Sequence, residues 1–189
     1  MPTKSAAAPR DRLLEAANKL FYEEGIHTVG IDRIIEKAGV AKASLYSSFG
    51  SKDELIREYL LLRLSRRKER VEKAMAAATS PRARILAVFE LLGEFFETPG
   101  FRGCAFLRAS AEGPPHKKVK AVCSESRSWL RGLFLEQCRD AGAPEPEQLA
   151  RQLTLLYDGA TVAAQMDSDP SAAQVARAAA ATLLDSLPA

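Results

Sequence analysis

Two short helical patterns separated by a glycine constrain the fold of this chain more than any other feature. In residues 31–38, isoleucine or alanine recurs at i, i+3, i+4 and i+7, which is one face of a short helix. Gly39 then provides the positive φ that a tight exit from this helix favours. A second short helix is expected over residues 42–49. A glycine-containing turn between two such helices is typical of a helix-turn-helix, whose second helix enters the major groove of DNA.

The second helix of this pair has one apolar side and one polar side. Leu45 and Phe49 are predicted to be buried on its inner side. The outer side is predicted to present residues that include no acidic side chain: Lys42, Ala43, Ser44, Tyr46 and Ser47. Such a face can donate hydrogen bonds to base edges and phosphates without repelling the DNA backbone.

A long helix is predicted to start directly after this pair, at Ser51. Ser51 and Glu54 have the S-x-x-E spacing of a capping box, in which the hydroxyl and the carboxylate each accept a hydrogen bond from a backbone N–H group at the helix start. Lys52, on the same first turn, is placed to reach a phosphate. The simpler alternative is that these are three ordinary helices of an all-α domain.

The order of the whole segment resembles the DNA-binding domain of TetR-family (TetR/AcrR-type) transcriptional regulators. The likeness covers residues 10–57, where AGVAKASLYSSFGSKDEL follows an amphipathic helix that ends in LFYEEG. It implies an all-α fold of about nine helices, with a helix-turn-helix domain over residues 10–57 and a ligand-binding and dimerisation domain over residues 58–189. Residues 1–9 are expected to form a disordered arm.

The resemblance also implies roles for single residues. By motif position, the residues that look groove-facing are Lys42, Ala43, Ser44, Tyr46 and Ser47. Tyr46 and Lys52 look like phosphate anchors, and Arg33 is similar to family positions that touch DNA from the flank.

The chain departs from the family pattern at three positions. Gly30 replaces the threonine that usually opens the second helix, and Ala41 replaces the serine that usually caps the recognition helix. Ser48 stands where a histidine commonly precedes the phenylalanine. Because a lost cap typically costs about 1 kcal/mol, the recognition helix is expected to be less well anchored when unbound.

Composition agrees with DNA binding and gives an enzyme little support. Residues 1–73 carry 15 basic and 11 acidic side chains, whereas the remainder carries 12 and 13, so positive charge gathers toward the N-terminus. The two histidines, His27 and His116, are not accompanied by a nucleophile elbow, a phosphate loop or metal-ligand spacing. We therefore expect no catalytic residues, no metal and no cofactor.

The cysteines and the hydropathy pattern bear on location and regulation. Cys104, Cys123 and Cys138 are too widely spaced for a zinc or CxxC site and are expected to be small buried groups. Regulation by their oxidation remains an alternative. No run approaches the roughly 18 apolar residues of a membrane span, and the first residues lack the apolar core of a signal peptide. A cytoplasmic protein without a membrane partner is expected.

The last two helical patterns, at about residues 147–166 and 171–187, have wide apolar faces. The resemblance implies that this pair forms a four-helix interface with its two-fold mate, so a homodimer is expected. The predicted interface consists of Leu149, Leu153, Leu156, Ala160, Ala164, Val175, Ala179 and Leu183. Packing within one chain is the alternative. An isologous dimer would place two recognition helices about 34–36 Å apart, as a palindromic operator requires.

Aromatic residues of the middle helices are the candidates for an effector pocket. The predicted lining consists of Phe89, Phe96, Phe101, Phe106, Ser110, Trp129, Phe134, Tyr157 and Gln165, with Arg108 and His116 as further polar groups. An aromatic stripe at helical spacing is more often core than ligand contact, so each residue also has that simpler interpretation. Such a lining favours a hydrophobic or aromatic small molecule.

The sequence therefore predicts a sequence-specific DNA-binding transcriptional regulator. By family default it would be a repressor that binds a palindromic operator in double-stranded DNA. A small-molecule effector would release it from this operator. Two alternatives stay open: the same dimer controlled by cysteine oxidation, and a helical adaptor that does not bind DNA.

Overall fold

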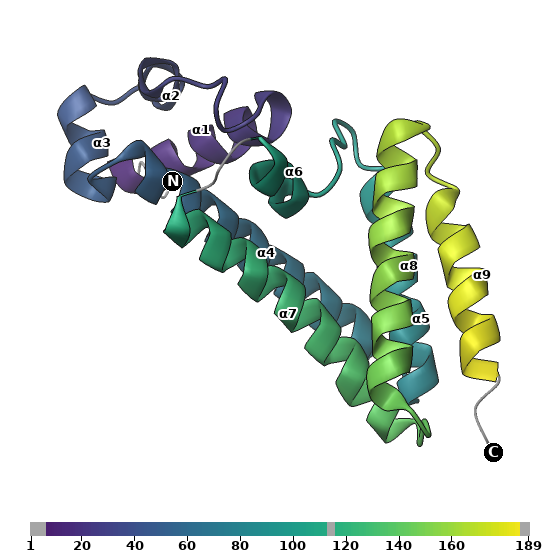
Figure 1. Ribbon diagram of the computed structural model, residues 1–189. Helices are drawn as coiled ribbons and strands as arrows, with labels where there is room; N and C mark the ends of the chain where they lie inside the picture. Colours follow the sequence, from purple (N-terminus) through teal and green to yellow (C-terminus); the bar gives the residue numbers. More distant parts are fainter. Residues whose placement is uncertain (1–6, 113–115, 186–189) are drawn as a thin grey trace, which may run out of the picture. The chain divides into compact units, whose positions relative to one another are not determined.

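The fold is entirely α-helical over the part of the chain that the structure describes, residues 7–112 and 116–185 of a computed structural model. These residues form nine helices and no strand, which confirms the predicted class (Figure 1). The helices are α1 (Pro9–Glu24), α2 (Ile31–Ala38), α3 (Lys42–Phe49), α4 (Lys52–Ala76), α5 (Pro81–Phe96), α6 (Ala105–Ala111), α7 (Lys117–Asp140), α8 (Pro146–Met166) and α9 (Ala172–Asp185). Residues 1–6 of the predicted arm lie outside the described residues, and Pro9 already belongs to α1.

The chain divides into two compact units. Unit 1 consists of Met1–Arg63 with Ala105–Cys123, and unit 2 consists of Leu64–Cys104 with Ser124–Ala189. Helices α4 and α7 each contribute their first part to unit 1 and their second part to unit 2. Helix α6 thus belongs with the N-terminal helices, although it is distant from them in the sequence.

Unit 1 has its own hydrophobic core beneath the helix-turn-helix. Its fully buried side chains include Leu13, Ala17, Val29, Ile34, Leu45, Leu55 and Leu60. Phe21 of α1 lies against Tyr59 of α4 with 5.5 Å between their ring centroids. Full burial of one large apolar side chain contributes about 1.5–3 kcal/mol, so these contacts hold α1 to α4 as a platform for α2 and α3.

Unit 2 is built on α5, the second parts of α4 and α7, and the pair α8 and α9. Helix α5 begins with Pro81 at its first position, and the Ser80 hydroxyl accepts a hydrogen bond from the Ala83 N–H group at 3.2 Å. Phe89 stacks on Phe134 at 5.8 Å in the middle of the core. Alanines line the buried side of α9, namely Ala173, Ala176 and Ala180, and permit close approach to α5 and α8.

None of the helices within the described ranges combines the length and the apolar character that crossing a membrane would require.

Candidate nucleic-acid interface

The turn between α2 and α3 has the geometry of a helix-turn-helix connection. Gly39 adopts a left-handed conformation, with φ 61° and ψ 45°, and ends α2 at the residue that the sequence predicted. Its N–H group donates to the Glu36 carbonyl at 3.1 Å, and the Arg12 guanidinium donates to the Gly39 carbonyl at 3.3 Å. Because a side chain at Gly39 would be strained in this conformation, the glycine fixes how α3 leaves α2.

Helix α3 buries the two residues predicted for its inner side. Leu45 and Phe49 belong to the core of unit 1, and the guanidinium of Arg10 lies 5.0 Å from the centroid of the Phe49 ring. The opposite side is exposed and carries Lys42, Ala43, Tyr46 and Ser47. Tyr46 is 47% exposed, an unusual state for a large aromatic side chain.

One predicted groove-facing residue differs from the others. Ser44 is half-buried, and its backbone carbonyl accepts a hydrogen bond from the Ser47 hydroxyl at 3.2 Å. Four of the five candidates thus share one exposed face of α3, and Ser44 lies at its edge.

The starts of α2 and α3 have no side-chain cap, in keeping with the departures at Gly30 and Ala41. These residues occupy the N-cap positions of α2 and α3, and neither helix has a side-chain hydrogen bond at its cap. The first turn of α3 closes through the backbone, where the Ser44 N–H group donates to the Ala41 carbonyl at 2.9 Å. The free recognition helix therefore lacks one of its usual stabilising contacts.

Two cations of the predicted interface are paired within unit 1. Lys42 Nζ lies 2.8 Å from Asp32 Oδ1, and the hydrogen bond and the charge of Asp32 raise the pKa of Lys42. Arg33 pairs with Glu24. Exposed pairs of this kind contribute about 0–1 kcal/mol, so a DNA phosphate can replace the carboxylates at low cost. The sequence pattern of α3 did not reveal Asp32, because this carboxylate comes from α2.

The start of α4 confirms one half of the predicted capping box and corrects the other half. The Ser51 hydroxyl accepts a hydrogen bond from the Glu54 N–H group at 3.2 Å. The Glu54 carboxylate was predicted to accept from the start of the helix, but it binds the ammonium of Lys118 and lies 3.8 Å from Arg57 Nη1. Ion-paired hydrogen bonds are stronger than neutral ones, which explains why the carboxylate turns toward these cations.

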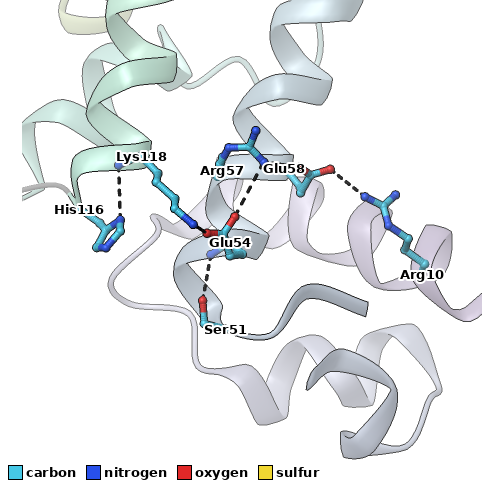
Figure 2. A network of polar contacts seen from close by, with 7 residues as sticks. All are labelled: Arg10, Ser51, Glu54, Arg57, Glu58, His116 and Lys118. Atoms are coloured by element: carbon cyan, nitrogen blue, oxygen red, sulfur yellow. Dashed lines mark hydrogen bonds and ion pairs between the residues drawn. The ribbon is translucent and has the colours of Figure 1, made fainter. Parts of the chain in front are cut away.

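Glu54 belongs to a chain of polar contacts around the first turns of α4 and α7 (Figure 2). Glu58 contacts Arg57 at 2.8 Å and Arg10 at 2.7 Å. The hydrogen bond from Lys118 is the main cause that lowers the pKa of Glu54. Figure 2 shows Lys118 pointing from α7 to Glu54, so the first turn of α7 is tied to the helix that follows the recognition helix. Lys52, on the same turn of α4, is half-buried, and this burial lowers its pKa.

A second anchor joins α6 to the turn between α1 and α2. The Glu112 carboxylate accepts hydrogen bonds from the N–H groups of Ile26 at 2.8 Å and His27 at 3.2 Å. Arg108 of α6 donates to the Tyr22 carbonyl at the end of α1. Gly25 has φ 100°, and a Cβ atom there would lie 2.9 Å from the Glu112 carboxylate. The sequence patterns did not reveal this anchor, because its two sides are 86 residues apart.

The predicted effector residues separate into three places. A pocket of about 390 Å³ in unit 2 is lined by Phe96, Phe101, Arg102, Ala164, Gln165, Ser168 and Pro170, which include three of the candidates. Phe89 and Phe134 are fully buried core residues, with Tyr157 beside Phe89 and Trp129 partly exposed on α7. Phe106 and Ser110 belong to α6 in unit 1, where the Ser110 hydroxyl donates to the Phe106 carbonyl at 2.9 Å.

The polar candidates outside this pocket already have contacts in unit 1. Arg108 is part of the anchor at Tyr22, and the His116 Nδ1 atom accepts from the Lys118 N–H group at 3.4 Å.

The predicted dimer residues are mostly covered by the chain itself. Leu149, Leu153, Ala160 and Ala164 are buried in the core of unit 2. Leu156, Ala179 and Leu183 are half-buried, and only Val175, at 69% exposed, stands fully out of the core. Four large apolar residues of this helix pair are exposed, namely Leu155, Val162, Met166 and Val175. The periodicity of α8 and α9 indicated wide apolar faces but could not separate the side packed within the chain from the side left open.

The three cysteines are free thiols that differ in burial. Cys138 is fully buried, which raises the pKa of its thiol to about 11, whereas Cys104 and Cys123 are half-buried. Within the described residues, no group of three or more histidine, cysteine, aspartate or glutamate side chains is arranged to hold a metal ion.

Comparison with known proteins relates this geometry to regulators of transcription. Residues 13–59 match the family model described as "Bacterial regulatory proteins, tetR family". The chain is 34% identical to SCO4454, a TetR-family transcriptional regulator from Streptomyces coelicolor, over 95% of each chain with a TM-score of 0.88. A structure of the TetR-family regulator CifR, a cysteine mutant bound to 26-base-pair operator DNA, is 25% identical over 98% of this chain and 100% of that one, with a TM-score of 0.78.

A further match covers about half of the chain. The chain is 36% identical to the transcriptional activator FasR of Mycolicibacterium smegmatis over 49% of its own length, and it covers 43% of the length of FasR. These relatives are regulators and not enzymes. The family match in the helix-turn-helix and the full-length likeness to SCO4454 lead to one assignment: the chain belongs to the TetR family of helix-turn-helix transcriptional regulators.

Proposed function

We propose that this protein is a homodimeric repressor that binds a palindromic operator in double-stranded DNA and leaves it when a small-molecule effector binds. The observation that carries the proposal is the exposed face of α3, which presents Lys42, Tyr46 and Ser47 beyond the tight turn at Gly39. A short helix with exposed donors and a buried opposite side is the element that such proteins place in the major groove.

The residues proposed to contact DNA divide into two groups. We assign the groove to Lys42, Ala43, Ser44, Tyr46 and Ser47, with Ser44 at the edge of the contact and the Lys42 ammonium on a phosphate that borders the groove. Arg33 and Lys52 are assigned to phosphates that flank it, and Tyr46 reaches a phosphate with its hydroxyl. On binding, Lys42 exchanges Asp32 for a phosphate, and Arg33 exchanges Glu24 in the same way.

The proposed domain division places DNA binding in residues 10–57 and ligand binding with dimerisation in residues 58–189. We assign the dimer contact to two sets of residues on α8 and α9. The exposed set is Leu155, Val162, Met166 and Val175, and the half-buried set is Leu156, Ala179 and Leu183. An apolar face of this kind is unfavourable in water, and a two-fold mate covers the same face on both protomers. A regulator that acts on bacterial chromosomal DNA works in the cytoplasm.

The pocket at Phe96, Phe101 and Gln165 is the proposed effector site. Its rings favour a hydrophobic or aromatic molecule, and its amide and hydroxyl groups can orient one polar substituent. The effector lowers operator affinity only through a higher affinity for the state that does not bind DNA, and about 1.4 kcal/mol of difference gives a tenfold change. Helix α4 contributes to both units, so a change in its orientation is the proposed route to α3.

Control by cysteine oxidation has weaker support. The raised pKa and full burial of Cys138 disfavour its reaction with oxidants, and Cys104 and Cys123 are each half-buried.

Salt dependence of DNA binding tests the proposal and separates it from a helical adaptor. For a protein that neutralises phosphates, the logarithm of the DNA-binding constant falls linearly with the logarithm of the salt concentration. The slope is about −0.9 for each phosphate contact. We expect a steep slope for the dimer on genomic fragments, reduced by about one for each protomer in Lys42→Gln. Lys73→Gln, an exposed lysine of α4 in unit 2, is the matched control and should keep the wild-type slope. A flat salt dependence for the wild type would exclude the DNA-binding proposal.

A further inference from the structure

Arg67 is a half-buried cation in unit 2 that the DNA-binding proposal does not use. It lies on α4, and its Nη1 atom donates to the Ser126 hydroxyl at 3.2 Å. Ser126 itself is only 2% exposed. The Arg67 Nε atom is enclosed, and it has no hydrogen-bond partner within the described residues. A guanidinium has five N–H donors, so this environment leaves much of its hydrogen-bonding capacity unused.

Two aromatic rings flank the guanidinium. Its Cζ atom lies 5.4 Å from the centroid of the Trp129 ring and 5.0 Å from that of Tyr157. Tyr157 is held in turn by Phe89, with 6.2 Å between the ring centroids. The faces of these rings attract the cation but offer no acceptor to its N–H groups. Arg67 is therefore positioned from two sides without being neutralised.

The carboxylates next in sequence to Ser126 and Tyr157 are paired with other cations. Glu125, next to Ser126, pairs with Lys68 at 3.2 Å. Asp158, next to Tyr157, pairs with Arg127. Lys68 and Arg127 thus each have a carboxylate partner. Over the ranges that the structure describes, Arg67 has none. A partly desolvated charge without a counter-ion is unfavourable, and an incoming anion would relieve that cost.

We propose that Arg67 and Ser126 form a binding site for a small aromatic carboxylate. The planar guanidinium matches a carboxylate through two parallel hydrogen bonds, and the Ser126 hydroxyl is a further donor at the same place. The aryl group of the ligand lies against Trp129 and Tyr157, which favour a ring over an inorganic anion. The site goes beyond the proposed effector pocket, because none of its four residues lines that pocket.

Trp129 provides the measurement, because it is the single tryptophan of the chain. The full-length protein is titrated with benzoate while Trp129 fluorescence is recorded. Benzyl alcohol is the control with a ring and no charge, and acetate is the control with a charge and no ring. We expect benzoate to bind saturably, with the weak affinity that is typical of so small a ligand. Either control should bind with an affinity at least about tenfold lower. Inorganic phosphate distinguishes an aryl carboxylate site from a general anion site.

Matched variants locate the site. Arg67→Gln should weaken benzoate binding by about tenfold or more, since it removes the charge-assisted hydrogen bonds. Arg66→Gln removes the same charge from an exposed neighbour on α4 and should bind benzoate like the wild type. Ser126→Ala is a milder change that should also weaken binding, and it keeps the test available if Arg67→Gln does not fold. Circular dichroism checks the fold of each variant.

Several outcomes would overturn the proposal. It fails if benzoate gives no saturable change, if benzyl alcohol binds as well as benzoate, or if phosphate binds and benzoate does not. It also fails if folded Arg67→Gln and Ser126→Ala both retain wild-type affinity. None of these outcomes depends on whether the protein binds an operator, so the regulator proposal is judged separately.

Discussion

The carboxylate of Glu112 holds the backbone N–H group of Ile26 at 2.8 Å, and thereby joins the end of α6 to the turn that leads into the helix-turn-helix. The same oxygen accepts from His27 at 3.2 Å, and Gly25 leaves the space that the carboxylate needs. Two N–H groups that α1 and the turn leave without a helical partner are thus satisfied by a side chain 86 residues away. This contact makes the geometry of the DNA-binding helices depend on α6.

Replacing this carboxylate should destabilise the protein. Glu112→Ala leaves the Ile26 and His27 N–H groups without their acceptor, and a hydrogen bond to a charged group contributes about 1.5–3 kcal/mol. We expect a loss of about 1–2 kcal/mol in the free energy of unfolding, because the site is only partly buried. Urea denaturation followed by circular dichroism measures it. Glu147→Ala, which removes an exposed carboxylate paired with Arg139, should change stability far less. Equal effects of the two variants would contradict this role of Glu112.

The left-handed conformation of Gly39 gives a second prediction. Gly39→Ala should destabilise the protein by about 1–2 kcal/mol, because a Cβ atom is strained at φ 61°. Gly132→Ala is the opposite case: this glycine lies in the middle of α7 with open space around the added Cβ, so alanine should stabilise by roughly 0.5–1 kcal/mol. Thermal unfolding of both variants checks the signs. A stabilising Gly39→Ala would mean that the turn differs from the one described.

The Glu54–Lys118 pair predicts a pH dependence. Pairing with Lys118 lowers the pKa of Glu54 in the folded protein, so its contribution to stability is present above the unfolded pKa and is lost as the pH falls through the folded pKa. In Lys118→Met, the pKa of Glu54 should rise toward its ordinary value of 4.5. An NMR titration of the side-chain carboxyl carbon measures this shift. Lys117→Met removes an exposed neighbouring charge and should leave the pKa of Glu54 lower than in Lys118→Met.

From the exposed apolar side of α8 and α9, we predict that charged substitutions there prevent dimerisation. Met166 is 78% exposed and Leu155 is 65% exposed, so a charge at either position costs little within one chain. In a dimer that covers these residues, Leu155→Glu with Met166→Glu would bury two carboxylates on each side, and we expect a monomer. Sedimentation velocity reports the mass, and Gln152→Glu on an exposed polar position of α8 is the control. A double variant that stays dimeric, with the wild type dimeric, would place the interface elsewhere.

The sequence was sufficient for features set by local patterns. The bounds of α2 and α3, the buried positions of Leu45 and Phe49, and the Ser51 cap follow from helical periodicity and glycine or serine at a helix end. Contacts that join distant segments were not predictable in this way. Asp32 beside Lys42 and Glu112 beside Ile26 depend on how the helices pack.

Periodicity also could not decide which neighbour covers an apolar face. Leu153 and Val175 have equivalent places in their sequence patterns, yet Leu153 is fully buried in unit 2 and Val175 is exposed. The aromatic candidates separate for the same reason. Phe96 and Phe101 line a pocket, while Phe89 and Phe134 fill the core, because the packing of the helices of unit 2 decides which ring is enclosed.

Selection of genomic fragments by the purified full-length protein tests the central claim most directly. At moderate salt, the wild type should enrich fragments that share one palindrome, with half-sites about one helical turn apart. Tyr46→Ala removes an exposed side chain of α3 without disturbing the core, so it should stay folded and dimeric while the enrichment is lost. Enrichment of the same palindrome by both proteins would remove Tyr46 from the interface. A folded, dimeric wild type that enriches no common sequence would contradict the account of a site-specific repressor.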